Sequence, residues 1–218
     1  AMAAIRHLFE KAGGGYDTYL QTEEVFEQHR PIVAGDELQI DVELTSVRQI
    51  AGRELITVTN TFTDTAGERV HTLHTTVVGL TAEDVDPAIK GAVQKAMMHD
   101  VDILGVGDSE AAYQKTVRPE GEIRIADGTA RTPGTPSLDD VKVGDVLPVH
   151  HTRLSRGDLV NYAGVAGDAN PIHWDEDIAK LAGLPDVLAH GMLTMGLGAG
   201  FASAWSGDPG AVTRYTVR

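Results

Sequence analysis

Alternating polar and apolar residues dominate the first third of the chain. Residues 37–44 alternate strictly, which is the two-residue period of a strand with one buried face. The β-branched run 55–63 and the run 69–80 predict two further strands, with Gly-containing turns before each of them. Three strands joined by short turns predict an antiparallel meander within a β-rich segment, residues 17–80.

The pattern changes after residue 80. Residues 88–99 are compatible with a short helix, but Gly and Pro then recur too often for any long element. We interpret residues 81–136 as a linker. The chain is therefore expected to divide into residues 1–80, this linker, and a third part, residues 137–218.

The third part begins with a predicted strand over residues 146–154. Ser155 and Asp158 then have the spacing of a capping box, in which each side chain bonds an unpaired backbone N–H group of the other. The helix that follows is expected to end near Gly167, because glycine favours the left-handed conformation found after helix ends. Its expected apolar face consists of Leu159, Tyr162, Ala163 and Ala166.

Two more helices and a strand are predicted after this helix. Acidic residues 175–177 favour a helix N-terminus, and the apolar face expected to follow consists of Trp174, Ile178, Leu181 and Ala182. Residues 188–205 are apolar nearly all round and include several Gly, which predicts a helix enclosed on every side. Residues 211–218 begin another strand.

Charge and composition exclude several classes of function. The net charge is −14, from 32 acidic and 18 basic residues, which opposes general nucleic-acid binding. The chain has no Cys, so disulfides, thiolate catalysis and Cys-bound zinc are excluded, and a cytoplasmic location fits. No apolar run is long enough to span a membrane. A basic patch for an anionic carrier would have to come from Arg153, Arg156, Arg214 and Arg218.

The segment 166–173 is the most informative candidate for chemistry. It places Asp168, Asn170 and His173 around a rigid Asn-Pro turn between two predicted helices. Two titratable groups held stiffly together are what general acid–base catalysis requires. The alternative is ordinary turn chemistry, with Asp168 as a helix cap and His173 packed in the core. A metal site formed with Asp175 is a weaker alternative.

His190 and Gly191 are the second candidate, because they begin the apolar helix. The first N–H groups of a helix lack intrahelical partners and could hold a thioester oxygen as it becomes an enolate. The alternative is that His190 caps the helix and Gly191 permits a tight turn. The glycine-rich run 196–200 lies inside the helix, so we interpret it as close packing rather than a nucleotide loop.

The Asn-Pro loop resembles the MaoC-like hydratase family, whose signature is G-D-x-N-P-[LIV]-H. Roughly residues 140–218 look like the catalytic B subunit of the mycobacterial-type (3R)-hydroxyacyl-carrier-protein dehydratase. Residues 17–80 resemble the C-terminal half of its non-catalytic A or C partner, so together they resemble a fused A–B form. The residues that match the signature are Gly167, Asp168, Asn170, Pro171, Ile172 and His173.

This resemblance implies an α+β fold, the double hot dog, in which each antiparallel sheet wraps around one central helix. The family pattern extends beyond both ends of this sequence, so we expect the chain to be a fragment. Residues 1–80 would be part of a non-catalytic hot dog, and residues 137–218 part of the catalytic one.

The resemblance also implies a hydro-lyase that reversibly dehydrates (3R)-hydroxyacyl thioesters to trans-2-enoyl thioesters in fatty-acid elongation. His173 would be the base at C2 and Asp168 would handle the departing hydroxyl. The backbone N–H of Gly191 would stabilise the enolate oxygen, with Asn170 and His190 in support. No metal or other cofactor is expected.

The expected partner is an acyl thioester of acyl carrier protein or CoA, in a homo-oligomer or a larger fatty-acid synthesis assembly. An (R)-specific enoyl-CoA hydratase is the alternative enzyme. A non-catalytic acyl-binding hot dog is less favoured, because Asp168 and His173 are intact, and a thioesterase would favour a different arrangement.

Overall fold

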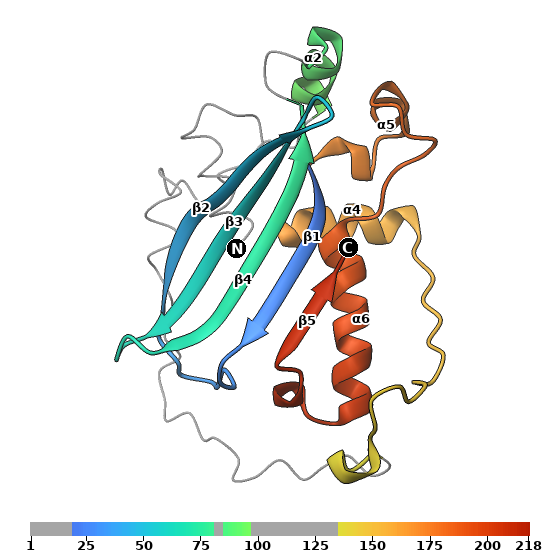
Figure 1. Cartoon of the computed structure of the whole chain (residues 1–218). Helices are drawn as coiled ribbons and strands as arrows, with labels where there is room; N and C mark the ends of the chain where they lie inside the picture. Colours follow the sequence, from blue (N-terminus) through green and yellow to red (C-terminus); the bar gives the residue numbers. More distant parts are fainter. Residues whose placement is uncertain (1–18, 81–84, 97–134) are drawn as a thin grey trace.

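The computed structural model describes residues 19–80, 85–96 and 135–218 (Figure 1). Most of the predicted linker lies outside these residues. None of the helices in the described ranges is long and apolar enough to cross a membrane.

A single antiparallel sheet forms the centre of the described structure, with strands in the order β2-β3-β4-β1-β5 (Figure 1). The three predicted strands are confirmed as the meander β2-β3-β4. The final predicted strand is confirmed as β5, which pairs with β1 and so joins the two ends of the chain in one sheet. The strands are β1 Tyr19–Gln28, β2 Leu38–Ile50, β3 Arg53–Asp64, β4 Arg69–Gly79 and β5 Arg214–Val217.

A two-residue turn sets the register of the β2–β3 hairpin. Ala51 and Gly52 both have positive φ, 52° and 75°, between the paired residues Ile50 and Arg53. Two successive residues of this kind match the right-handed twist of paired strands, so the turn favours a regular hairpin.

The middle of the sheet is buried on both faces. Val58, Thr59 and Asn60 are consecutive residues of β3, and all three are buried. The edge strand β2 is different, because Ile40 and Leu44 are about half exposed. The core of the described structure therefore lies over β3, β4 and β1.

The helices occur close to their expected positions. The α-helices are α2 Pro87–Ala96, α4 Arg156–Ala166, α5 Glu176–Leu181 and α6 Gly191–Ser206. Short 3-10 helices are η2 Leu138–Asp140, η3 Pro171–His173 and η4 Pro209–Ala211. Val93 of α2, Ile172 of η3 and Ile178 of α5 form a small apolar cluster that packs these elements together.

Helix α6 lies beside β5 (Figure 1), where the Tyr215 hydroxyl donates to the Met195 carbonyl at 3.3 Å. A β-carbon on Gly198 would come within 2.3 Å of the Tyr215 oxygen. This confirms close packing at Gly198. The prediction that α6 is enclosed on every side is wrong for the described residues, since only Met195 is buried. The described chain covers α6 mainly from the β5 side.

Two other expectations are wrong. Residues 146–154 form no strand, because no described strand lies beside them to pair with, and Val146 and Val149 are 94% and 80% exposed. In α5, Leu181 and Ala182 are exposed instead of buried. The buried face of that helix is Ile178 with Ala179, which turns toward η3 and α2.

Candidate active site

The loop that carries Asp168 begins at a well-defined helix end. Ser155 and Asp158 form the predicted capping box at the start of α4, with Ser155 N–H donating to the Asp158 carboxylate at 2.7 Å. Gly167 ends the helix with a φ of 69°, a left-handed conformation that other residues rarely adopt. The chain therefore turns sharply at Gly167, directly before Asp168.

Asn170 and Pro171 fix the next turn. The Asn170 side-chain oxygen accepts from the Ile172 N–H at 3.3 Å, and Pro171 is the first residue of η3, where its fixed φ suits a helix start. Asn170 thus caps η3 with its side chain. The helix caps around the loop are Gly167, Asn170 and Asp175, so the alternative of Asp168 as a cap is wrong.

His173 is held by the segment that precedes α6. Its Nδ1 lies 2.7 Å from the Leu188 carbonyl oxygen, and the Leu188 N–H donates to the Ile172 carbonyl at 3.0 Å. Because a carbonyl only accepts, Nδ1 must carry a proton, so the neutral form of the ring has its lone pair on Nε2.

The Nε2 side of the His173 ring faces Asp168. The Nε2 atom lies 3.7 Å from Asp168 Oδ2, and the two side chains are only 9% and 15% exposed. The predicted meeting of carboxylate and imidazole is therefore present in the structure.

His190 stacks on one face of the His173 ring. The centroids of the two imidazole rings are 3.8 Å apart and their planes are inclined by 24°. The Tyr162 ring packs edge-on against His190, with ring centroids 5.0 Å apart. Burial, and then the nearby His173, lower the pKa of His190, which favours its neutral form. His190 occupies the N-cap position of α6, as the capping alternative expected, but its side chain makes no cap hydrogen bond there.

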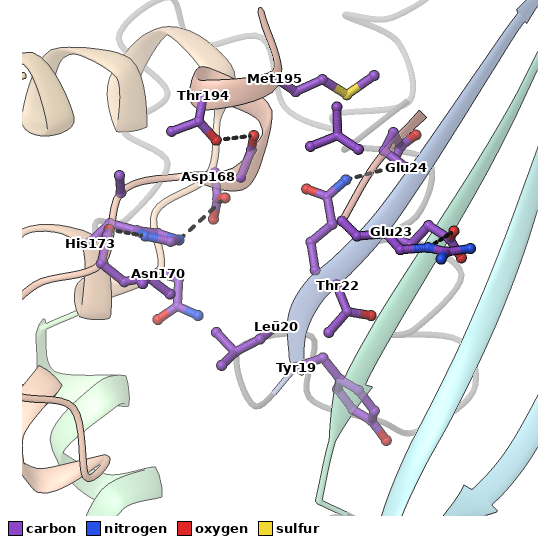
Figure 2. Close-up of a pocket in the computed structure, with 16 residues that line it drawn as sticks. Tyr19, Leu20, Thr22, Glu23, Glu24, Asp168, Asn170, His173, Thr194 and Met195 are labelled. Carbon is purple, nitrogen blue, oxygen red and sulfur yellow. Dashed lines mark hydrogen bonds and ion pairs between the residues drawn. The ribbon is translucent and has the colours of Figure 1, made fainter. Parts of the chain in front are cut away.

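A cavity of about 260 Å³ connects these residues to the first strand. Figure 2 shows Asp168, Asn170 and His173 along one side and Tyr19 to Glu24 of β1 along the other. Gly191, the first residue of α6, also lines this cavity. The unpaired N–H groups of the helix start therefore lie at the same cavity as the Asp168–His173 pair.

The residues best placed to meet one metal ion are Asp168, His173 and His190, whose ligand atoms lie within 4.8 Å of one another. A histidine binds a metal ion through a lone pair in the plane of its ring. Because the His173 and His190 rings are stacked and nearly parallel, both lone pairs could point at one ion only if one ring tilted. Asp175 is not part of this group, because its carboxylate accepts from the Ile178 N–H at 3.1 Å.

Sequence reasoning missed the contribution of β1 to this cavity. Gln21 and Glu24 line it, and Glu24 is 2% exposed. The signal that could have revealed them is the run Thr22-Glu23-Glu24, polar residues that interrupt the alternation of an otherwise mixed strand.

The arginines considered for a carrier-binding patch are largely paired with acids. Arg156 bonds Glu176 and Asp186, at 2.8 and 2.7 Å. Arg214 of β5 and Arg218, the residue after this strand, pair with acidic residues of β1, at 3.3 and 2.6 Å. Of the four, only Arg153 makes no ion pair in the described residues, so they do not form a free basic patch there.

The long helix beside an antiparallel sheet, with an Asp–His pair and a helix start at one cavity, defines a hot-dog-fold protein. Residues 140–218 match the MaoC like domain, and residues 1–73 match the FAS1-like, dehydratase domain region. The last third of the chain is therefore similar to MaoC-like domains, and the first third is similar to the FAS1-like dehydratase region.

A solved structure titled MaoC-like dehydratase is 79% identical and superposes with a TM-score of 0.78, covering 100% of this chain and 64% of that one. The mitochondrial 3-hydroxyacyl-[acyl-carrier-protein] dehydratase of Arabidopsis thaliana is 38% identical over 99 residues, 45% of this chain and 55% of the relative. The (R)-specific enoyl-CoA hydratase of Rhodospirillum rubrum is 37% identical over 79 residues, which are 34% of this chain and 51% of the relative. The chain thus spans about half the length of these curated relatives.

Proposed function

We propose that this chain carries the active site of a hydro-lyase that interconverts (3R)-hydroxyacyl and trans-2-enoyl thioesters. The observation that supports it best is the facing of His173 Nε2 and the Asp168 carboxylate, 3.7 Å apart, at the cavity that Gly191 also lines. A base, a second titratable group and unpaired N–H donors are the groups this reaction requires.

In the dehydration direction, His173 Nε2 removes a proton from C2 of the substrate. The electron pair of that C–H bond moves into an enolate, whose negative charge rests largely on the thioester oxygen. The backbone N–H of Gly191 donates to this oxygen, and the positive end of the α6 dipole adds to its stabilisation. The Leu188 carbonyl keeps His173 in the tautomer that a base needs.

The second step breaks the bond between C3 and the hydroxyl oxygen. The enolate electrons form the C2–C3 double bond, and the hydroxyl takes up a proton held at the His173–Asp168 pair and leaves as water. Asp168 orients that oxygen, and the same pair positions water in the hydration direction. His190 supports the His173 ring from behind, and Asn170 keeps the loop rigid.

The substrate carrier separates the two enzymes that share this chemistry. Our first choice is a dehydratase of fatty-acid elongation that acts on acyl-carrier-protein thioesters, in the cytoplasm and in a homo-oligomer or larger assembly. The alternative is an (R)-specific enoyl-CoA hydratase, which the similarity to the Rhodospirillum rubrum protein favours. In either case residues 1–80 would form a supporting hot-dog half and residues 137–218 the catalytic half of a double hot dog, joined by the linker 81–136.

Loss of absorbance of the conjugated enoyl thioester on hydration tests the proposal. Asp168→Asn and His173→Ala should each lower kcat/KM by about 10²-fold or more, the range of a lost acid–base group. Asp177→Asn and His151→Ala change exposed residues of the same types and serve as matched controls. If both site variants hydrate the substrate as fast as the controls do, the proposal is wrong.

The carrier is tested in the same assay with matched acyl chains on acyl carrier protein and on CoA. A clearly higher kcat/KM for the carrier-protein thioester supports the dehydratase of fatty-acid elongation. The opposite preference supports the enoyl-CoA hydratase.

A further inference from the structure

Strand β1 contains a bulge that turns two polar side chains toward the cavity. Its pairing with β4 runs Gln21 to Val77 and then Glu23 to Thr76, so Thr22 is an extra residue in the ladder. In a regular strand, residues three apart point to opposite faces. With one extra residue between them, Gln21 and Glu24 lie on the same face. Bulges that redirect side chains are frequent beside active sites.

Glu24 is a buried carboxyl group with two hydrogen-bond partners. Its Oε1 accepts from the Thr75 hydroxyl at 2.9 Å, and its Oε2 accepts from Nε2 of Gln21. Burial raises its pKa to about 7, although both of these hydrogen bonds act in the opposite direction. Because Thr75 occupies Oε1, a proton taken up by Glu24 is best placed on Oε2, facing Gln21.

The Gln21 carboxamide packs on the first turn of α6. Its Oε1 lies 3.2 Å from the position of a β-carbon on Gly191, and its Nε2 lies 3.3 Å from the Met192 sulfur. The amide therefore sits beside the N–H group assigned to the thioester oxygen. Its oxygen and nitrogen ends have nearly the same shape, so reversing the amide costs little packing.

We propose that Gln21 is a substrate-contacting residue supplied by the N-terminal part of the chain, and that the protonation of Glu24 sets which end of its amide faces the thioester oxygen. Protonated Glu24 donates to Oε1 of Gln21, which turns Nε2 toward the thioester oxygen as a second donor beside Gly191. Ionised Glu24 holds Nε2 for itself and leaves Oε1 facing the enolate, which opposes its negative charge. This inference rests on the proposed hydro-lyase function.

Other charged groups face Glu24 from the same cavity. Glu23 and Arg218 pair with each other at 2.6 Å, and Asp168 and His173 line the opposite side. From β4 the facing group is the neutral Thr75, and α6 contains no ionisable residue. A fall of activity toward alkaline pH is the effect that ionisation of Glu24 explains.

The test is the pH profile of kcat and KM for enoyl-thioester hydration between about pH 5.5 and 9. The wild type should lose activity as pH rises through about 7. Glu24→Gln should lose this decline, because its own amide can donate to Gln21 at every pH. Gln21→Ala should lower kcat by about 10-fold or more, the order expected for a lost oxyanion donor, with little change in KM and no alkaline decline. Gln39→Ala, an exposed change on β2, is the matched control.

The possible outcomes distinguish failure of this inference from failure of the proposed hydro-lyase function. A wild type without hydration activity refutes the proposed function and this inference with it. An active wild type whose kcat and pH profile survive Gln21→Ala, or an alkaline decline that persists in Glu24→Gln, refutes only the inference.

Discussion

His173 shows how a short loop can give one side chain a defined chemical state. The Leu188 carbonyl fixes the proton on Nδ1, the stacked His190 ring limits rotation, and Asp168 faces the remaining nitrogen. Each contact acts on a different part of the ring. The loop therefore holds the proposed base in place before substrate binds, which lowers the ordering that the proposed catalysis would otherwise require.

The residue-scale prediction concerns Gly191. A methyl group there would lie 3.2 Å from Gln21 Oε1, so Gln21 must shift away from the helix start. We expect Gly191→Ala to lower kcat/KM by about 10-fold or more, since removal of a full oxyanion donor costs about 10²-fold. The melting temperature should hold or rise, because Ala favours a helix over Gly.

Gly196→Ala is the control, since a β-carbon there meets nothing within 4 Å. It should gain the same helix propensity and keep full activity. Equal activity of the two variants would show that the space beside Gly191 has no bearing on catalysis.

At the scale of elements, the sequence predicted those whose signals are local. The capping box of Ser155 and Asp158, the helix ending at Gly167 and the β2–β3–β4 meander all depend on neighbouring residues, and all are present. Strand β1 was not predicted as a separate strand, because the extra residue at Thr22 breaks its alternation. The strand predicted over residues 146–154 is absent, because strand pairing depends on a partner that the local sequence does not reveal.

The site shows the same difference between features that depend on neighbouring residues and features that depend on distant ones. The family signature located Asp168, Asn170 and His173, whose spacing is local. The stack with His190 and the opposing wall of Gln21 and Glu24 come from distant segments, so the loop signature does not predict that they meet.

The packing of α6 against β5 gives the element-scale prediction. Gly198→Ala would place a methyl group 2.3 Å from the Tyr215 oxygen, so it should destabilise the protein by about 1–3 kcal/mol through overpacking. Thermal unfolding would report this as a fall of about 2–4 °C per kcal/mol. Gly196→Ala again serves as the control.

Tyr215→Phe in the Gly198→Ala background should restore most of that loss. It removes the clashing oxygen and leaves the nearest ring atom at 3.6 Å, an ordinary contact. By itself, Tyr215→Phe should cost about 1 kcal/mol, from the hydrogen bond to the Met195 carbonyl. A double variant that is less stable than Gly198→Ala would contradict this packing.

At the scale of the whole molecule, the cavity depends on both ends of the chain. Strand β5 pairs with β1, residues Glu24 to Glu27 facing Val217 to Arg214, and this pairing places β1 opposite the Asp168 loop. Glu24, from the first part of the chain, therefore lines the same cavity as Asp168 and His173 from the last part.

The whole-molecule prediction is a pH dependence of stability caused by Glu24. Its pKa rises from 4.5, the ordinary value, to about 7 in the folded protein. The favourable contribution of the protonated group is therefore fully present below pH 4.5 and is lost as pH rises toward 7. Glu24→Gln stays neutral, so its melting temperature should exceed that of the wild type by several degrees at pH 8, where each pKa unit corresponds to about 1.4 kcal/mol.

The difference between the two proteins should be smallest at pH 4.5, widen up to about pH 7 and stay constant above it. Other titrating groups are common to both proteins and largely cancel in this comparison. A difference that is the same at every pH would show that the Glu24 carboxyl does not titrate in this range.

The central claim is that Asp168 and His173 act together on one substrate. A double-mutant cycle of kcat/KM for enoyl-thioester hydration, with Asp168→Asn, His173→Ala and the pair combined, tests it most directly. Residues that act as a unit are not additive, so the double variant should be about as slow as the slower single variant. Losses that multiply in the double variant would mean that the two residues act independently, and would contradict the claim.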